Sequence, residues 1–194
     1  MKLTRPLLRS DHVARPDLVD RLQAGRNRRL TLLAAPLGFG KTTLLPEWAG
    51  AEPGRAVAWL SLDDDENDPA RFFAYVIAAL QTAIPHVGDR ALATLGMPGA
   101  GLITVVLSLL INDLDGVDEP TALVLDDYHV ITNAGIRDAV CYLVEHLPEA
   151  LRLVVSTLAE PHLPLARLRA RGELVELRAD ASPTKRRRRF LAML

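Results

Sequence analysis

Cysteine is almost absent from this sequence, which has only Cys141 among its 194 residues. A single cysteine cannot form an internal disulfide, and no group of cysteine and histidine has the spacing of metal ligands. We therefore expect neither a disulfide framework nor a structural zinc site. Cys141 is interpreted as a small buried apolar side chain rather than a nucleophile.

The sequence also lacks an excess of charge and a long apolar run. Its 23 basic residues balance 24 acidic ones, which excludes a whole-surface field that would attract nucleic acid or acidic lipid. The most apolar stretch, 102–111, is well short of the roughly 20 residues that cross a bilayer. The N-terminus has no apolar core of a secretory signal. We expect a cytoplasmic protein that makes no membrane contact, with 102–111 as a core helix.

Short apolar runs alternate with amphipathic helical patterns along the chain. This alternation predicts an α/β fold, with a mainly parallel sheet flanked by helices, and the length fits one domain. Expected strands cover 30–35, 56–60, 122–125, 153–156 and 174–177. Expected helices cover 17–24, 41–49, 70–84, 102–114 and 136–147, and 85–101 is expected to be a loop or a short helical insertion.

A phosphate-binding loop follows the first of these strands. Residues 35–42, APLGFGKT, end in the Gly-Lys-Thr of a Walker A motif, with alanine in place of its first glycine. Glycines let backbone N–H groups turn toward phosphates, and the N-terminus of the following helix favours anions. Lys41 is expected to reach the β and γ phosphates, and the Thr42 hydroxyl to bind Mg²⁺. The candidate nucleotide contacts here are Pro36, Gly38, Phe39, Gly40, Lys41, Thr42 and Thr43.

A second motif makes an ordinary tight turn with a solvated Lys41 a poor alternative. The apolar run 122–125 ends in Asp126 and Asp127, as in a Walker B strand. Carboxylates at the end of a buried parallel strand lie beside the crevice where ligands bind. We assign Asp126 to Mg²⁺, directly or through water, and Asp127 to the attacking water. The candidate catalytic residues are therefore Asp127 and Lys41, and the candidate metal ligands are Thr42 and Asp126.

Six segments in order resemble the NTPase core of MalT-type (LuxR family) transcriptional regulators, a bacterial branch of the STAND ATPases. The segments are VARP at 13–16, APLGFGKTT at 35–43, AWLSLD at 58–63, NDPARF at 67–72, LDDYHVI at 125–131 and PLARLRARG at 164–172. The resemblance extends to about residue 178, and alanine at position 35 is usual in the family. It implies an AAA+/STAND-like P-loop NTPase fold for 1–178.

The resemblance also implies a function. Such proteins use ATP against ADP occupancy to switch between resting and active, self-associating states. It implies that Val13 and Arg15 lie on the adenine side of the nucleotide, although a surface role for Arg15 is nearly as good an interpretation. It further implies that this chain is truncated before the sensor and helix-turn-helix modules of a complete regulator. DNA contact would come only through those modules.

Two departures from the family pattern stand out. Relatives usually carry an arginine after the fourth strand, where this chain has Leu158, so the γ-phosphate sensor of the family is missing and ATP hydrolysis is expected to be weak at most. Residues 179–194 form a divergent basic tail containing KRRRR at 185–189. We expect this tail to be disordered or to arise from a frame shift, which resequencing the gene would test.

Alternatives of other classes stay open on the sequence alone. One is a free-standing P-loop ATPase or small-molecule kinase, which needs an acceptor site that the sequence does not identify. Another is an interaction module that nucleotide stabilises without catalysis, which the missing arginine favours. ATP binding, hydrolysis and nucleotide-dependent self-association would separate these functions.

Overall fold

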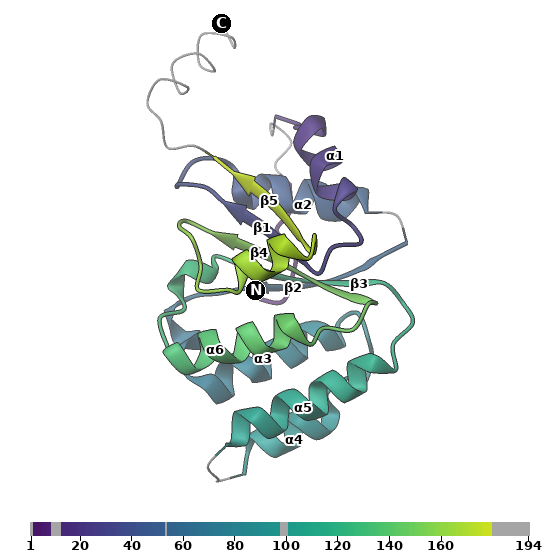
Figure 1. Ribbon diagram of the computed structural model, residues 1–194, viewed down its shortest axis with the longest axis vertical. Coiled ribbons are helices and arrows are strands. Elements are labelled where there is room, and N and C mark those ends of the chain that lie inside the picture. The colour runs from purple at the N-terminus through teal and green to yellow at the C-terminus, as the bar shows by residue number, and fades with distance from the viewer. Residues whose placement is uncertain (1, 9–12, 53, 98–100, 180–194) are drawn as a thin grey trace, which may run out of the picture.

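The computed structural model describes residues 2–8, 13–52, 54–97 and 101–179. Within them lies a parallel sheet of five strands in the order β2-β3-β4-β1-β5 (Figure 1). The strands are β1 Leu30–Ala34, β2 Ala56–Ser61, β3 Thr121–Asp126, β4 Leu151–Thr157 and β5 Leu174–Arg178. The predicted α/β class and all five predicted strands are confirmed, with ends that shift by one or two residues.

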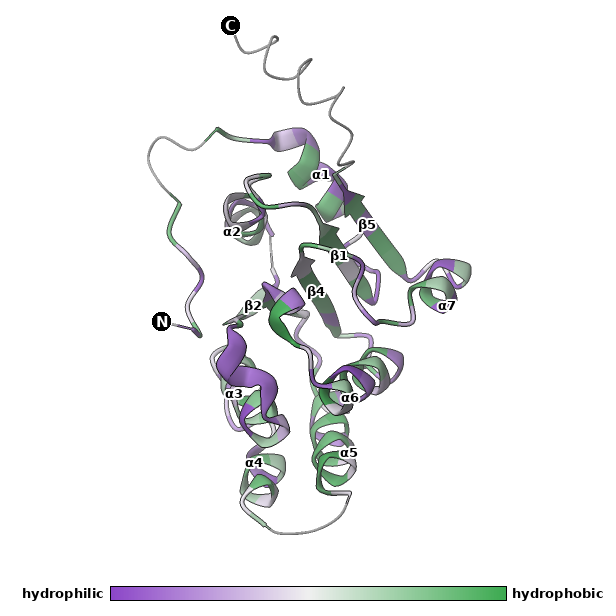
Figure 2. Cartoon of the chain, turned by 90° about the vertical axis from the view of Figure 1, so that its left-hand side faces the viewer, coloured by the Kyte–Doolittle hydropathy of each residue, from purple (hydrophilic) through white to green (hydrophobic). Residues whose placement is uncertain are grey.

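Helices cover both faces of this sheet, as Figures 1 and 2 show. The helices α1 and α2 lie on one face and α3 and α6 on the other, with α4 and α5 beyond α3. Their bounds are α1 Pro16–Ala24, α2 Lys41–Ala51, α3 Pro69–Gln81, α4 Asp89–Leu95, α5 Leu102–Asp115, α6 Ala134–Glu145 and α7 Leu165–Ala170, with 3-10 helices η1 Asp64–Asn67 and η2 Tyr128–Val130.

The central strand β4 shows why the strands are continuously apolar. Its side chains alternate between faces, so Leu153 and Val155 enter the core beneath α3 and α6 while Val154 packs with Trp48 beneath α2. Both faces of a parallel sheet are covered by helices, and a strand within it needs apolar residues at every position. Because the strands are buried on both faces, the positions of their ends, where the site residues lie, are fixed.

Side-chain caps start the two helices on the other face. Asp68 accepts a hydrogen bond from Arg71 N at 2.8 Å, and Pro69 occupies the first turn of α3, where its missing N–H costs nothing. Asn133 accepts one from Ile136 N at 3.3 Å at the start of α6. The capping residues therefore mark these helix starts in the sequence.

Several expectations are refined or corrected. The segment 85–101 contains the short helix α4, which packs along α5, so it is a helical insertion rather than a bare loop. Cys141 is only half-buried, and its thiol donates to the His162 carbonyl, so its description as a buried side chain is wrong. The helix α5 buries Val106 and Leu110 but exposes Val105, and it therefore lines the core along one side only. The predicted tail, from residue 180 onward, lies outside the described residues.

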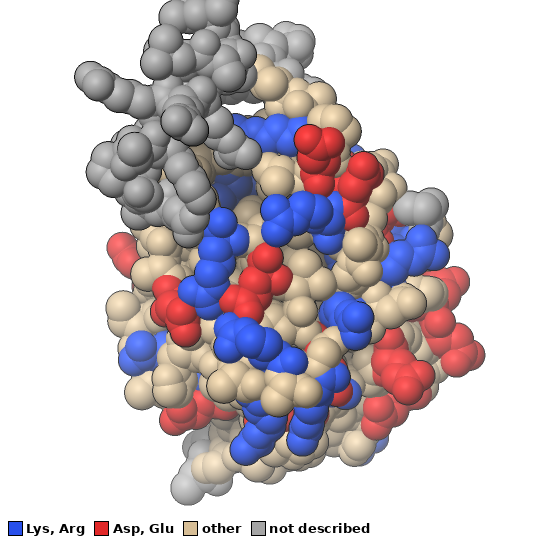
Figure 3. Space-filling view, turned by 45° about the horizontal axis from the view of Figure 1, so that its top comes forward, with Lys and Arg blue, Asp and Glu red and all other residues tan. Residues whose placement is uncertain are grey.

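None of the helices in the described ranges combines the length and apolarity that a membrane crossing requires. On the face that Figure 3 shows, Lys and Arg side chains gather beside Asp and Glu. This mixture is what the near-zero net charge of the whole chain leads one to expect.

Candidate functional site

The loop between β1 and α2 has the backbone of a phosphate-binding loop. Gly38 and Gly40 adopt left-handed conformations, with φ of 79° and 75°. Residues other than glycine adopt such backbone angles only at a cost in free energy, so glycine is favoured at both positions. The helix α2 begins directly at Lys41, which places its free N–H groups and its favourable dipole beside the loop. The strand, loop and helix expected from the sequence are all present.

Lys41 folds back over this loop. Its Nζ donates to the Ala35 carbonyl at 2.8 Å and to the Pro36 carbonyl at 3.4 Å, and the residue is only 7% exposed. Thr42, next to it on α2, is exposed. The cation is thus held by neutral carbonyl groups of the loop itself. Because these are weaker acceptors than an anion, Lys41 stays available for an anion.

Arg15 contacts the same loop from the start of α1. Its Nη1 donates to the Phe39 carbonyl at 2.7 Å, and its backbone N donates to Glu47 Oε1 at 3.0 Å. A Cβ added to Gly40 would lie 3.1 Å from Arg15 Nη2, so the guanidinium packs directly on that glycine. Val13 is 59% exposed. The structure therefore brings Arg15, predicted on the adenine side, onto the phosphate loop, and leaves Val13 at the surface.

The two carboxylates stand where β3 ends. Asp126 is 2% exposed and accepts a hydrogen bond from the Ser156 hydroxyl. Asp127 adopts a left-handed conformation (φ 60°, ψ 38°), and its backbone N donates to Ser156 Oγ at 2.9 Å. Its side chain is 42% exposed, with His129 Nδ1 3.8 Å from Oδ1. The Asp126 carboxylate is thus buried and held in place, whereas the Asp127 carboxylate is exposed to solvent.

Charge around Asp126 links it to the phosphate loop. Burial raises the pKa of its carboxyl group above the ordinary value, and the negative charge of Asp127 raises it further. The Ser156 hydrogen bond and the positive charge of Lys41 oppose this rise. The effect of Lys41 on the pKa of Asp126 is thus smaller than that of burial.

The strand order explains how the two motifs meet. β4 lies between β1 and β3, with Thr157 paired to Ala34 of β1 and Val155 paired to Leu125 of β3. All strands run parallel, so the loop after β1 and the carboxylates after β3 stand at the same edge of the sheet, which faces the viewer in Figure 2. Leu158 follows β4 directly at this edge and is half-buried.

The two arginines that come next in the sequence after Leu158 are paired with glutamates. Arg167 Nη1 lies 2.5 Å from Glu145 Oε1, and Arg169 Nη2 lies 2.6 Å from Glu176 Oε1. Both pairs belong to α7 and its neighbours. Leu158, which the family resemblance predicts at the sensor position, carries no charge.

The donor set fits a magnesium ion that a nucleotide helps to hold. The described residues contain no group of three or more His, Cys, Asp or Glu able to hold a metal by itself. Mg²⁺ commonly takes one or two protein oxygens together with water and substrate phosphates, so it needs no such cluster. The exposed Thr42 and the buried Asp126 could supply those oxygens.

Sequence reasoning missed two residues of this site. Ser156 bridges Asp126 and Asp127, and Glu47 holds the backbone of Arg15. A polar residue that ends the apolar run 153–155 is a usable signal for the first, once β4 is known to lie beside β3. Glu47 looks like any polar residue on a helix, and its sequence context carries no signal.

Comparison with known proteins agrees with this geometry. The chain is 38% identical over 176 residues to "HTH-type transcriptional regulator MalT" of Yersinia pestis (strain Pestoides F) and 37% identical to the protein of that name from Yersinia enterocolitica. The chain carries a P-loop domain of the MalT type. The matches cover 91% of this chain but 19% of each relative, so it spans about a fifth of the MalT proteins. No protein-family model matches the sequence.

Solved structures share the fold of this MalT-type domain. Cdc6p from Pyrobaculum aerophilum matches with a TM-score of 0.58 at 15% identity, over 89% of this chain and 47% of its own. The Aeropyrum pernix Orc1 protein in complex with DNA matches with a TM-score of 0.57 at 18% identity, over 92% and 47%. These likenesses confirm the predicted fold, an α/β domain with a parallel sheet flanked by helices.

Proposed function

We propose that this chain binds Mg²⁺-ATP or ADP and serves as the nucleotide switch of a MalT-like transcriptional regulator. One observation carries the proposal: Lys41 with its glycine loop and Asp126 with Asp127 stand at one edge of the sheet, separated only by β4. The identity to MalT proteins supports the assignment to a regulator. The Lys41 cation and the buried Asp126 carboxylate stand at the same edge of the sheet, which supports a site for an anion with a metal ion.

Each residue has a defined part in this proposal. Lys41 exchanges the carbonyls of Ala35 and Pro36 for phosphate oxygens, which are charged acceptors and therefore bind the ammonium more strongly. Thr42 and Asp126 hold Mg²⁺, which neutralises charge on the phosphates. Asp127, exposed beside them, orients a water molecule for slow hydrolysis.

The remaining nucleotide contacts lie along the loop. Backbone N–H groups from 38–43 surround the phosphates, and the Arg15 guanidinium on Gly40 holds the loop in shape. Pro36, Phe39 and Thr43 complete the loop, and Val13, exposed ahead of Arg15, is left for the adenine side. Nucleotide-dependent self-association and a cytoplasmic location belong to the same proposal, and DNA contact falls to other modules of the regulator.

Replacing Lys41 tests the proposal most directly. Lys41→Ala removes the only side-chain cation proposed to contact the β and γ phosphates, and we expect affinity for Mg²⁺-ATP to fall at least tenfold. Isothermal titration calorimetry on the purified chain measures this. Arg90→Ala removes an exposed cation on α4 and should leave affinity unchanged. Equal affinity in the Lys41 variant and the unmodified chain would contradict the assigned loop.

A further inference from the structure

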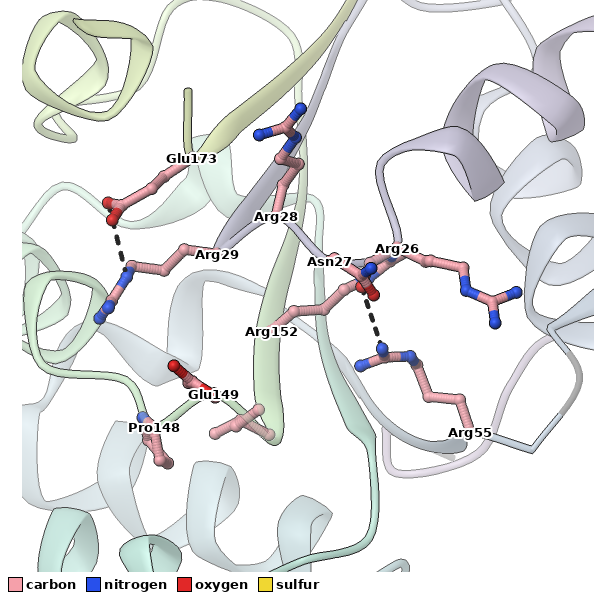
Figure 4. A pocket seen from close by; sticks show the side chains of 10 residues that line it. Arg26, Asn27, Arg28, Arg29, Arg55, Pro148, Glu149, Arg152 and Glu173 are labelled. Atoms are coloured by element: carbon pink, nitrogen blue, oxygen red, sulfur yellow. Dashed lines mark hydrogen bonds and ion pairs between the residues drawn. The ribbon is translucent and has the colours of Figure 1, made fainter. Parts of the chain in front are cut away.

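A cavity lies at the opposite edge of the sheet from the phosphate loop. Its volume is about 350 Å³, and its lining comes from the segments that lead into β1, β2, β4 and β5. Because all strands are parallel, these amino-terminal ends stand away from the nucleotide edge. Figure 4 shows the side chains of this cavity. It therefore has no part in the site described above.

Arginine dominates this lining. Five arginines and two glutamates are among its ten residues, although basic and acidic residues are balanced over the whole chain. An apolar lining is typical of ordinary ligand pockets, and this one is instead polar and cationic. The composition favours a ligand with at least two negative charges.

A buried positive charge reinforces that preference. Arg152 is 2% exposed, and its Nη2 lies 3.8 Å from Glu52 Oε1, whose side chain is equally buried. Arg55 shares the same carboxylate, with Nε 3.5 Å from Oε2. Two guanidinium groups thus face one carboxylate, which leaves one positive charge uncompensated in a region of low dielectric. Burial lowers the pKa of Arg152 to about 10.

The donors of Arg152 are also unused. None of its three guanidinium nitrogens has a hydrogen-bond partner, and the group lies over the Trp48 ring at 4.6 Å from its centroid. Figure 4 shows the side chain extending from β4 toward Asn27 and Arg55. A buried guanidinium without hydrogen bonds is costly unless a further anion lies close to it.

Three further arginines of the lining are held in place by backbone carbonyls. Arg55 Nη2 donates to the Arg26 carbonyl at 2.9 Å, Arg28 Nη1 donates to the Gly172 carbonyl, and Arg29 Nη1 donates to Leu147 O at 2.8 Å. Each guanidinium group has five N–H donors. These contacts fix the direction of the side chain and leave other donors available for a ligand. Arg28, Arg29 and Arg55 are accordingly oriented cations at the cavity.

We propose that this cavity, lined by Arg28, Arg55 and Arg152, binds the phosphate group of a small molecule. Planar guanidinium groups match phosphate oxygens in pairs. A volume of about 350 Å³ accommodates a small phosphorylated compound and is too small for a helix or a duplex. Glu149 and Glu173 line the same space, and their carboxylates can accept hydrogen bonds from hydroxyl groups of such a compound. The proposal does not depend on nucleotide binding at Lys41.

Titration of inorganic phosphate into the Lys41→Ala chain tests the proposal, because that background removes the competing loop. We expect saturable binding of one phosphate per chain by calorimetry. Arg55→Gln should weaken it at least tenfold, and Arg28→Gln should weaken it as well, since each change removes a charged donor. Arg90→Gln, which removes an exposed cation on α4, should have no effect. Glycerol phosphate in a second titration separates sources, since tighter binding than phosphate identifies an ester and equal binding identifies the free ion.

Further outcomes decide against the proposal. Failure to saturate, or equal binding in the Arg28, Arg55 and Arg90 variants, would show that phosphate is attracted only by general surface charge. Arg152→Gln adds the buried charge to the test and should abolish binding. If that variant does not fold, the Arg28 and Arg55 variants still give a decisive answer.

Discussion

At the scale of single residues, two neighbouring aspartates differ because their surroundings differ. Asp126 is buried and accepts a hydrogen bond from the Ser156 hydroxyl. Asp127 has a left-handed backbone, and its side chain is exposed to solvent. A non-glycine residue in that conformation carries a cost that functional sites often retain. This contrast supports one carboxylate that holds a metal ion and one that acts on water.

Asp127→Asn tests that division of roles. We expect affinity for Mg²⁺-ATP to change less than threefold and any hydrolysis to fall by roughly 10²- to 10⁴-fold, because the amide keeps the shape but cannot act as a base. Calorimetry and phosphate release measure the two effects. Asp138→Asn, a change at an exposed carboxylate on α6, is the control. If binding and hydrolysis fell together, Asp127 would be a metal ligand.

The sequence predicts some of these residues better than others, for physical reasons. Gly38, Gly40 and Lys41 form a local pattern that dictates its own backbone, so the loop is predictable. Ser156 acquires its role only because β4 lies beside β3, and no local pattern specifies that order. The Arg15 contact with Phe39 likewise joins two segments through tertiary packing.

At the scale of elements, Asn67 fixes the segment that follows the carboxylates. Its Nδ2 donates to the Val130 carbonyl at 2.9 Å, and its Oδ1 accepts from Thr132 N at 2.7 Å and from Asn133 N at 3.1 Å. One side chain therefore ties η1 to the end of η2 and to the start of α6. These elements keep the chain after Asp127 in place.

Asn67→Ala should therefore destabilise the protein more than an ordinary surface change. It leaves three backbone groups, two of them partly buried, without this partner, and we expect a loss of about 2 kcal/mol in the free energy of unfolding. Urea denaturation with an unchanged m-value measures it. Asn27→Ala, at an exposed position, should stay within about 0.5 kcal/mol. A loss of that small size in the Asn67 variant would mean that water replaces the side chain.

Helix prediction followed the strength of local signals. The Asp68 and Asn133 caps mark the starts of α3 and α6 to within two residues. The short helices α4 and α7 have seven and six residues, too few for a clear apolar period. Their packing against α5 and β5 stabilises them in place.

At the scale of the whole molecule, a nucleotide switch depends on telling ATP from ADP. In the proposed site, the phosphate loop and a metal ion would hold the β-phosphate common to both nucleotides, so discrimination needs a group that reads the γ-phosphate. A nucleotide that binds both conformational states of a protein with equal affinity shifts no population between them. Leu158 stands at the end of β4, between the loop and the carboxylates, and offers no charge there. We therefore expect this chain to bind ATP and ADP with similar affinity.

Leu158→Arg should restore the missing discrimination. An arginine directed at transferring phosphate is worth roughly 10³- to 10⁵-fold in rate in other NTPases, so the variant should hydrolyse ATP faster or prefer ATP over ADP. Calorimetry with both nucleotides and a phosphate-release assay measure these effects. Leu158→Met changes the side chain without adding charge and should do neither. Arg167 and Arg169 already pair with glutamates, so they offer no simple substitute. A folded, nucleotide-binding Leu158→Arg chain that shows neither effect would disprove the sensor role of this position.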